Sequence, residues 1–396
     1  MIFLLALALK LIVLPRSTSG FTLAWDLSPG PTARDGTSKQ GIRLHLPNHA
    51  SILRSQASSL RCYLKMEKLI RWGLVGCGDI AGKRVAPALQ SASGSHLLAC
   101  ARKQPDKLLE FQQRHAIPKG YVDPSELFAD PEIDAVYLAT PVFLHCLHAV
   151  EAAERGKHVL CEKPMAMEPF ECQLMVEACR SNGVKLGVAY YRRFYPVLLK
   201  MKELLEASVI GNVIMVRTTL VEHTQLGVQS WRFVPEAGGG GLLMDMVSHR
   251  LDLLCWLFGE PRSVAALTHT RELKIPVEDT GSLLIQFRGD LHAFVFASHC
   301  IHEPMDEFEI YGTTGRLRVS PLNGSQLHLF GARNEVFELP KADNVHQPLV
   351  EDFNEAIREG REPCVNGEQG MEASILLDAA YHAAREGKVV GFRPEV

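Results

Sequence analysis

The chain has 396 residues, which is long enough for two domains with separate hydrophobic cores. Its formal net charge of −3 and isoelectric point near 6.6 indicate no basic surface of the kind that binds nucleic acid. The ten cysteines form no C-x-x-C pair, and several lie in apolar runs, where cysteine behaves as a small hydrophobe. This usage predicts a reducing, cytoplasmic compartment rather than a secreted disulfide framework.

Residues 1–66 differ from the rest of the chain in charge, with eight lysines and arginines against two acidic residues. The apolar run 2–14 is interrupted by Lys10 and is too short to span a bilayer comfortably, so we expect no stable membrane insertion. It lacks the charged start and cleavage site of a secretory signal, whereas the basic, glutamate-free composition leaves an organelle transit peptide open. The interpretation that we favour is an N-terminal extension read from a wrong start, with Met66 as the initiator.

The first predicted strand, residues 69–75, ends in a glycine turn that reads Gly76-x-Gly78-x-x-Ala81, and a helix can follow over 81–89. A strand, a glycine turn and a helix in this order form a dinucleotide-binding fingerprint. Gly76 permits the tight turn, and Gly78 leaves no Cβ between the backbone and a pyrophosphate. Alone the motif is weak, because similar turns join strands to helices in proteins that bind no nucleotide.

Beyond this turn, apolar runs continue to alternate with helical stretches, which predicts a parallel sheet covered on both faces. The further predicted strands are 97–101, 121–122, 135–139, 158–161 and 185–190, and the further predicted helices are 105–115, 125–128, 145–155 and 169–182. We assign residues 67–190 to an NAD(P)-binding α/β domain with a Rossmann-type, doubly wound parallel sheet.

The rhythm changes after Tyr190, where strands follow one another without helices between them. The predicted helices are 195–207, 242–258, 348–359 and 369–386, and the predicted strands are 212–222, 263–270, 281–287, 292–301, 308–311, 316–319, 326–329 and 336–339. Short connections such as Arg288-Gly289-Asp290 indicate antiparallel pairing. Residues 191–396 are therefore predicted to form an α+β domain with a large, mostly antiparallel open sheet.

Ligands of an open parallel sheet bind outside the carboxyl ends of its strands. At these ends the predicted sheet carries the glycine turn, Arg102-Lys103, Thr140-Pro141, Glu162-Lys163-Pro164 and Tyr190-Tyr191-Arg192-Arg193. If the sheet is right, these groups converge on one crevice. Together they are more informative than any one of them alone.

The cofactor preference depends on Arg102, which stands where an acidic residue would bind the ribose hydroxyls of NAD. A guanidinium with Lys103 beside it suits a 2′-phosphate, so the sequence favours NADP over NAD. The alternative is a solvated pair that starts the next helix. Asp79 is expected to cap its own helix, because a pyrophosphate nearby would repel its carboxylate.

Two further segments offer groups for proton transfer. Lys163 lies at a strand end before Pro164, where a partly desolvated lysine can act in acid–base chemistry, although an exposed turn lysine is the commoner case. Asp245, His249 and Asp252 are spaced i, i+4 and i+7, which predicts one shared helix face with His249 as a base beside its carboxylate partner. The alternatives for this group are a surface ion pair or a metal site, and no further ligand with suitable spacing is evident.

With these residues assembled, the chain from about residue 69 to 396 resembles the glucose-fructose oxidoreductase / inositol dehydrogenase / MocA (GFO/IDH/MocA) family. The matching segments are Gly76-Cys77-Gly78-Asp79-Ile80-Ala81, Ile133-Asp134-Ala135-Val136, Thr140-Pro141 with His145, Gly156-Lys157-His158-Val159, Glu162-Lys163-Pro164, Arg193-Phe194-x-Pro196, Trp231-Arg232, Asp245 with His249 and Asp252, and Glu278-Asp279. Glu162-Lys163-Pro164 followed by Asp245 and His249 is a specific signature, whereas the glycine motif is not. Two features depart from the family pattern: Ala81 replaces the third glycine, and the N-terminal extension is not typical.

The resemblance implies an NAD(P)-dependent oxidoreductase that acts on a sugar, polyol or related hydroxy or keto compound. Lys163 would stabilise the charge on the reacting oxygen, His249 would move the hydroxyl proton, and Asp245 would orient the substrate, without a metal. The residues implied to bind the cofactor are Gly76, Gly78, Asp79, Ile80, Arg102, Thr140, Pro141, His145, Glu162, Lys163, Trp231 and Arg232, and those implied to bind substrate are Tyr191, Arg193, Asp245 and His249. The family commonly associates through the open face of the second sheet, so a homodimer or homotetramer is expected.

Two other functions stay open at this point. A few relatives use bound NAD transiently to cleave glycosidic bonds, and such an enzyme returns its cofactor to the starting state. A non-catalytic dinucleotide-binding regulator is the second alternative. Intact Lys163 and His249 argue against it, because binding alone requires neither.

Overall fold

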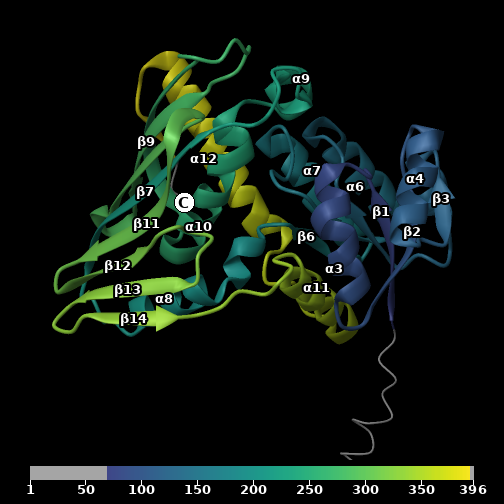
Figure 1. The fold of residues 1–396 in the computed structure, drawn as a ribbon, viewed down its shortest axis with the longest axis horizontal. Coiled ribbons are helices and arrows are strands. Elements are labelled where there is room, and N and C mark those ends of the chain that lie inside the picture. Colours follow the sequence, from purple (N-terminus) through teal and green to yellow (C-terminus); the bar gives the residue numbers. More distant parts are fainter. Residues whose placement is uncertain (1–68, 393–396) are drawn as a thin grey trace, which may run out of the picture. The chain divides into compact units, whose positions relative to one another are not determined.

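The structure is a computed structural model, and it describes residues 69–392. These residues belong to one compact unit that contains two sheets (Figure 1). The predicted N-terminal extension, residues 1–66, lies outside the described residues.

The first sheet has six parallel strands in the order β3-β2-β1-β4-β5-β6. Its strands are β1 (Ile70–Val75), β2 (Ser95–Ala101), β3 (Lys119–Tyr121), β4 (Ala135–Leu138), β5 (His158–Cys161) and β6 (Leu186–Val188), and its helices are α3 (Ala86–Ser91), α4 (Pro105–His115), α5 (Pro124–Ala129), α6 (His145–Glu154) and α7 (Pro169–Ser181). The chain moves outward from β1 to β3 and then returns to place β4 on the other side of β1. This reversal is the topological switch point at which doubly wound sheets bind ligands. The predicted Rossmann-type fold is confirmed.

The second sheet has nine strands in the order β14-β13-β12-β11-β7-β10-β9-β8-β15. Its strands are β7 (Val213–His223), β8 (Pro261–His269), β9 (Thr280–Phe287), β10 (His292–Ser298), β11 (Cys300–Gly312), β12 (Gly315–Val319), β13 (Gln326–Gly331), β14 (Glu335–Glu338) and β15 (Val390–Gly391). Every pairing is antiparallel except that of β7 with β10, which is parallel. The predicted large, mostly antiparallel sheet is therefore confirmed.

One strand boundary in this sheet was predicted wrongly. The predicted strand 292–301 ends at Ser298, and a new strand, β11, begins at Cys300 and runs through the predicted strand 308–311. The amide of His299 donates to the carbonyl of Asp279, and beyond it the chain pairs with the opposite edge of β7. Residues 301–305 are all exposed, so no alternation of apolar residues marks the start of β11 in the sequence.

Helices α8 (Pro196–Glu206), α9 (Pro235–Gly238), α10 (Ser248–Phe258), α11 (Gln347–Glu359) and α12 (Gly367–Glu386) accompany the second sheet in the chain. α12 packs against α10 and β8, and also against α7 of the first half. The indole nitrogen of Trp72 in β1 is fully buried and donates to Asn354 Oδ1 of α11 at 3.0 Å. These contacts join the last two helices to the first sheet and thereby position the loop that precedes α11.

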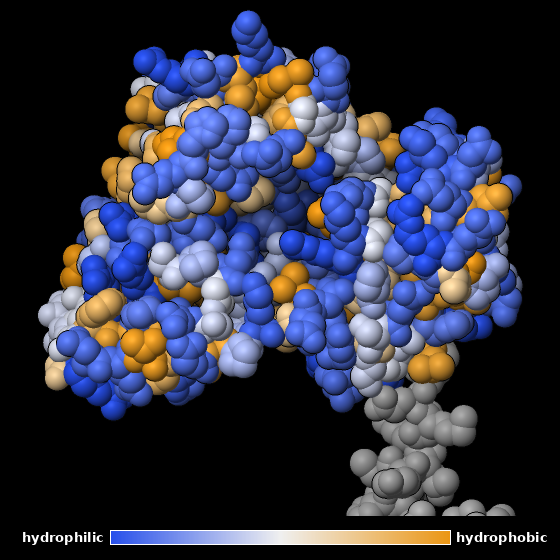
Figure 2. Space-filling model, viewed as in Figure 1, coloured by the Kyte–Doolittle hydropathy of each residue, from blue (hydrophilic) through white to orange (hydrophobic). Residues whose placement is uncertain are grey.

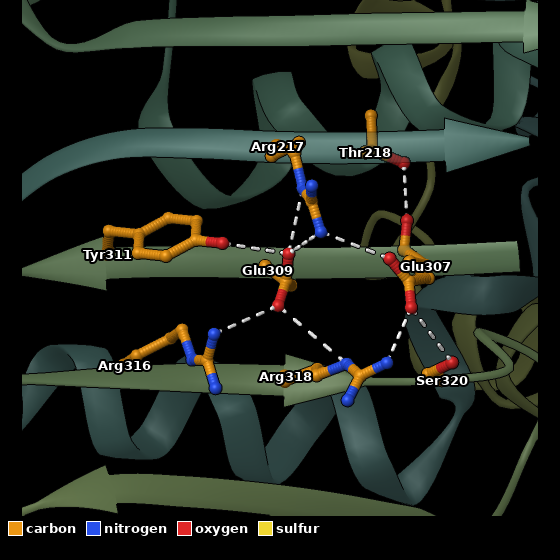
Figure 3. A network of polar contacts seen from close by, with 8 residues as sticks. All are labelled: Arg217, Thr218, Glu307, Glu309, Tyr311, Arg316, Arg318 and Ser320. Atoms are coloured by element: carbon orange, nitrogen blue, oxygen red, sulfur yellow. Dashed lines mark hydrogen bonds and ion pairs between the residues drawn. The ribbon is translucent and has the colours of Figure 1, made fainter.

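An ion-pair network covers part of the second sheet (Figure 3). Arg217 of β7 reaches Glu309 and Glu307 of β11 at 2.8 and 3.1 Å, and Arg318 of β12 pairs with both carboxylates. Their partners in the network are Thr218, Tyr311, Arg316 and Ser320. Neighbouring strands thus carry complementary charges on one face of the sheet.

Among residues 69–392, no helix combines the length and the apolar character that crossing a membrane requires.

Candidate active site

A cavity of about 760 Å³ lies where the carboxyl ends of the first sheet meet residues of the second half of the chain. Figure 2 shows the hollow near the centre of the view, with hydrophilic surface around it. Of the predicted site residues, those that line it are Asp79, Ile80, Thr140, His145, Glu162, Lys163, Tyr191, Trp231, Arg232, Asp245 and His249. Gly76, Gly78, Arg102, Pro141 and Arg193 are not among its lining residues.

The glycine loop has the backbone shape that a pyrophosphate site requires. Gly76 has a φ of +93°, and a Cβ there would lie 2.6 Å from the backbone of Ala139 and Thr140 at the end of β4. A Cβ on Gly78 would meet no atom within 4 Å, so the space in front of this residue is open. Gly76 is thus required by the packing of the switch point, whereas Gly78 leaves room for a ligand. Both observations fit a bound dinucleotide.

The helix after the loop begins at Asp79 and continues through a π-helical turn, Ala81–Val85, which has no side-chain cap. The predicted cap by Asp79 is therefore wrong. Its carboxylate instead pairs with Lys83 one turn ahead, at 2.9 Å, and both side chains are exposed. A cation four residues on offers the carboxylate a stronger partner than a backbone amide does.

Arg102 lies at the carboxyl end of β2 and turns toward the glycine loop. Its Nη1 donates to the carbonyl of Cys77, between the two glycines, and its Nε donates to Gln104 at 3.3 Å. The guanidinium therefore stands beside the loop although it does not line the cavity.

Lys163 is joined to the second half of the chain through Asp245. Its Nζ donates to the Asp245 carbonyl at 2.6 Å and to the carboxylate at 3.0 Å. Arg232 Nε lies 3.5 Å from the other carboxylate oxygen. Burial raises the pKa of Asp245, but the charges of Lys163 and Arg232 outweigh this effect and lower it below its usual value. The carboxylate is therefore ionised and holds both cations.

His249 lies on α10 and its ring is held between aromatic side chains. The ring centroids of Tyr191 and Tyr190 are 5.0 and 5.8 Å away, in edge-to-face arrangements. The side chain is 3% exposed, and its Nδ1 has no hydrogen-bond partner among the described residues. Burial, assisted by the charges of Arg192 and Lys163, lowers the pKa of His249 well below 6.5. The imidazole is neutral at neutral pH and can accept a proton.

The structure does not show the predicted pairing of His249 with a carboxylate partner, although Asp245 and His249 line the same cavity. A π-helical turn, Leu243–Val247, precedes α10, and the Asp245 carboxylate in this turn bonds to Lys163. Asp252 pairs with Arg193 instead, at 2.6 Å. Neither carboxylate hydrogen-bonds to His249 in the described part of the chain.

Arg193 is a buried structural group in this arrangement rather than part of the cavity wall. It is 4% exposed and donates three hydrogen bonds to Asp252 and one to Gln369 of α12. With these partners it connects the turn after β6, α10 and α12. This buried position does not support the predicted contact of Arg193 with substrate.

Glu162 and His145 line the cavity near the ends of β5 and β4. Glu162 Oε1 accepts from the Tyr137 hydroxyl at 2.8 Å and lies 3.4 Å from His346 Nε2. Burial raises the pKa of Glu162, but His346 and Lys163 lower it overall. The ring nitrogens of His145 lie 2.9 Å from the Thr140 carbonyl and 3.1 Å from that of Pro164, so His145 ties the two strand ends together.

Several cavity residues were not predicted as site residues. Arg192 stands in the predicted segment after β6 but was given no role, and Asn323, Lys341, Asn344 and His346 come from loops of the second half. Asn344 donates to the carbonyl of Arg84 at 2.8 Å, and the His346 ring contacts that of Tyr191 in a tilted arrangement with ring centroids 4.5 Å apart. Irregular loops carry no periodic signal, and only the doubling of Arg192-Arg193 marked this region in the sequence.

A Rossmann-type sheet with a glycine loop at its switch point, opening onto a cavity that holds a lysine, a carboxylate and a neutral histidine, defines a dinucleotide-dependent oxidoreductase. Comparison with known proteins leads to the same class. Residues 70–190 match the oxidoreductase family with the NAD-binding Rossmann fold, and residues 198–318 match the GFO/IDH/MocA C-terminal domain. The chain belongs to the GFO/IDH/MocA family of NAD(P)-dependent oxidoreductases.

The similarity to individual relatives extends over nearly their whole lengths. Oxidoreductase P35 of Formosa agariphila is 32% identical over 78% of this chain and 98% of its own. D-xylose 1-dehydrogenase (NADP(+)) 2 of Haloferax volcanii is 29% identical over 81% and 98%. The crystal structure of aldose-aldose oxidoreductase from Caulobacter crescentus, complexed with glycerol, superposes with a TM-score of 0.76 at 28% identity, over 82% of this chain and 100% of that one.

Proposed function

We propose that the protein is a dehydrogenase or reductase that interconverts a hydroxyl and a carbonyl group of a sugar, a polyol or a related compound. The observation that carries this proposal is the pair formed by Lys163 and Asp245 in the same cavity as the neutral His249. The names of two relatives, a xylose dehydrogenase and an aldose-aldose oxidoreductase, support the substrate class.

In the proposed mechanism Lys163 binds the reacting oxygen. Its ammonium has three N–H groups, and Asp245 accepts two of them. The third is available to an oxygen atom in the cavity, where it stabilises negative charge as the hydroxyl becomes a carbonyl or the reverse. Asp245 fixes the direction of this donor.

His249 moves the hydroxyl proton. Because its pKa is lowered by burial, the imidazole is free to accept this proton during oxidation and to return it during reduction. The edge-to-face contacts with Tyr190 and Tyr191 restrict its ring and so limit the directions in which the proton can pass. When bound, the nicotinamide ring supplies the hydride acceptor or donor.

We assign the dinucleotide to the glycine loop and favour NADP over NAD. The positive charge of Arg102 next to the Cys77 carbonyl supports this preference, since a guanidinium binds a 2′-phosphate in two-point fashion. Residues that would lie along the dinucleotide are Ile80, Thr140, Glu162, Trp231 and Arg232, all of which line the cavity.

The proposed function is tested with a panel of sugars and polyols, each assayed with NAD and NADP in both directions. We expect reduced cofactor to accumulate in proportion to oxidised product. Hydrolysis of a glycoside with no net change in cofactor would replace the proposal by the glycosidase alternative. Tight dinucleotide binding without turnover of any compound would favour a regulator.

We further propose that the protein is a homodimer or homotetramer that associates through the outer face of the second sheet. Leu284 and Phe294 are cross-strand partners that are 53 and 39% exposed, and Arg217 pairs with Phe294 in the register. The exposed leucine and phenylalanine therefore share a face with the ion-pair network of Figure 3. Light scattering tests this: Leu284→Glu with Phe294→Glu is expected to give monomers, and Leu109→Glu on α4 serves as the control.

A further inference from the structure

Arg192 is a buried cation without a counter-ion in the cavity wall. It lies in the 3₁₀ turn Tyr191–Phe194 after β6 and is 3% exposed, yet it lines the cavity. Its Nη1 has no partner, and its guanidinium forms no ion pair with any carboxylate in residues 69–392. Burying an unpaired guanidinium costs free energy unless a ligand supplies the missing negative charge and hydrogen-bond acceptors.

Neighbouring side chains hold Arg192 in one orientation. Its Nε donates to Asn323 Oδ1 at 3.3 Å, and the Tyr195 hydroxyl donates to the same oxygen at 3.4 Å. The amide nitrogen of Asn323 in turn lies 3.4 Å from Asp306, which accepts from Arg250. This chain of contacts occupies one side of the Arg192 guanidinium. Its Nη1 is left without a hydrogen-bond partner among the described residues.

Two further cations bear on the environment of Arg192. Arg250 is fully buried with two nitrogens unpartnered, and Asp306 is the one carboxylate that pairs with Arg250 in the described residues. Lys341 also lines the cavity and donates to the Asn323 carbonyl. Burial and the charge of Arg192 lower the pKa of Arg250 to about 9, so the two positive charges repel each other. An anion at this point would relieve the repulsion.

The charge of Arg192 also affects His249 at the proposed reaction centre. After burial, it is the strongest influence that lowers the pKa of His249. Asp245 is already bound to Lys163 and Arg232, so it does not offset Arg192.

We propose that the substrate carries a carboxylate, and that Arg192 binds this carboxylate beside His249. This inference rests on the proposed function and narrows its substrate class to acidic sugars and related hydroxy acids. A planar carboxylate matches the fork geometry of one guanidinium, and its single negative charge matches the charge of Arg192, which has no counter-ion among the described residues. A phosphate ester would bring more charge and more acceptor oxygens than this set of donors satisfies.

The test is a binding measurement that does not depend on turnover. Calorimetric dissociation constants are measured with saturating NADPH or NADH for matched pairs: D-glucuronate against D-glucose, D-galacturonate against D-galactose, and D-gluconate against D-glucitol. D-glucose 6-phosphate is the comparison for a phosphate group. We expect at least one acid to bind roughly tenfold or more tightly than its neutral partner, since a charge-assisted hydrogen bond contributes about 1.5–3 kcal/mol.

Substitution tests whether Arg192 causes the preference for the acid. Arg192→Gln should remove the preference for the acid, Arg192→Lys should restore part of it, and Arg180→Gln, an exposed arginine on α7, should keep it. Dinucleotide affinity should change by less than about threefold in Arg192→Gln, because a loss as large as that for the acid would place Arg192 on the cofactor. Acids that bind no better than their neutral partners, or tighter binding of the phosphate ester, would overturn the inference. Turnover of neutral sugars alone would leave the proposed function intact, whereas binding of an acid without any redox chemistry would remove the proposed function only.

Discussion

The Lys163 ammonium donates two hydrogen bonds to Asp245, one to the backbone carbonyl at 2.6 Å and one to the carboxylate at 3.0 Å. Lys163 follows β5 of the first sheet, and Asp245 lies in the π-helical turn before α10 of the second half. This contact therefore joins the two halves of the chain at the cavity. It directs the remaining N–H of Lys163. The direction of this donor therefore depends on the folding of both halves.

Substitution of Lys163 by alanine should lower kcat by about 10²-fold or more, because the developing charge on the reacting oxygen loses its donor. Dinucleotide affinity should change little, since the glycine loop is untouched. Asp245→Asn keeps an acceptor for Lys163 and should cost less. Steady-state kinetics together with fluorescence titration of NADPH check both variants. Near-normal turnover in Lys163→Ala would remove Lys163 from the mechanism.

The lowered pKa of His249 predicts a particular pH profile. At pH 6.5 a free imidazole is half protonated, whereas His249 remains neutral, so kcat/KM for oxidation should stay constant through this pH and fall only in more acidic solution. His249→Gln should lower kcat by about 10²–10⁴-fold and remove this acid limb. An acid limb that survives in the variant would assign it to another group.

The lowered pKa of His249 also affects the stability of the folded protein. Below about pH 6.5 the unfolded chain takes up a proton at residue 249 that the folded chain does not, so this residue favours the folded state less as the pH falls. Denaturant unfolding should therefore show that His249→Gln loses less stability between pH 7 and pH 5 than the wild type does. Identical slopes for the two proteins would contradict the assignment of the shift to His249.

Two glycines of the same loop should respond differently to alanine. Gly76→Ala forces a Cβ to within 2.6 Å of the β4 backbone at a φ of +93°, so it should destabilise the fold by at least about 1–3 kcal/mol. Gly78→Ala meets no atom of the protein, so the melting temperature should be unchanged while dinucleotide affinity falls. Thermal unfolding and NADPH titration distinguish the two effects. Equal affinity in wild type and Gly78→Ala would mean that no ligand approaches this residue.

Arg102→Asp should move the cofactor preference from NADP toward NAD by about tenfold or more, because it replaces a phosphate-binding cation by a carboxylate suited to ribose hydroxyls. The ratio of kcat/KM for the two cofactors is the appropriate measure. Arg114→Asp, an exposed arginine on α4, controls for the change in charge. An unchanged ratio would exclude Arg102 from cofactor selection.

The buried pair of Arg193 and Asp252 predicts a loss of stability rather than of substrate affinity. Removing one partner leaves an uncompensated buried charge, which costs about 3–5 kcal/mol. The double variant Arg193→Met, Asp252→Leu should recover much of this loss. If the double variant folds but has a greatly raised KM, Arg193 contacts substrate after all.

The sequence by itself determined the order of the elements and most of the groups at the strand ends. Alternation of apolar runs with helical stretches is a local property, and it predicted both sheets and placed Gly76, Thr140 and Lys163 at one edge. It also marked His249 through the residue types that this chemistry requires. These features depend on a few neighbouring residues, so no distant contact was needed to recognise them.

Only the tertiary structure decided how these groups pair. The Asp245 carboxylate, in the π-helical turn before α10, bonds to Lys163 from the first sheet. The partner of Asp252 comes from a turn 59 residues away, and Asn323 reaches Arg192 from 131 residues away. Pairings over such distances depend on packing between elements, and they cannot be predicted from the periodicity of an ideal helix. Helical spacing therefore located the catalytic candidates, but the fold set their partners.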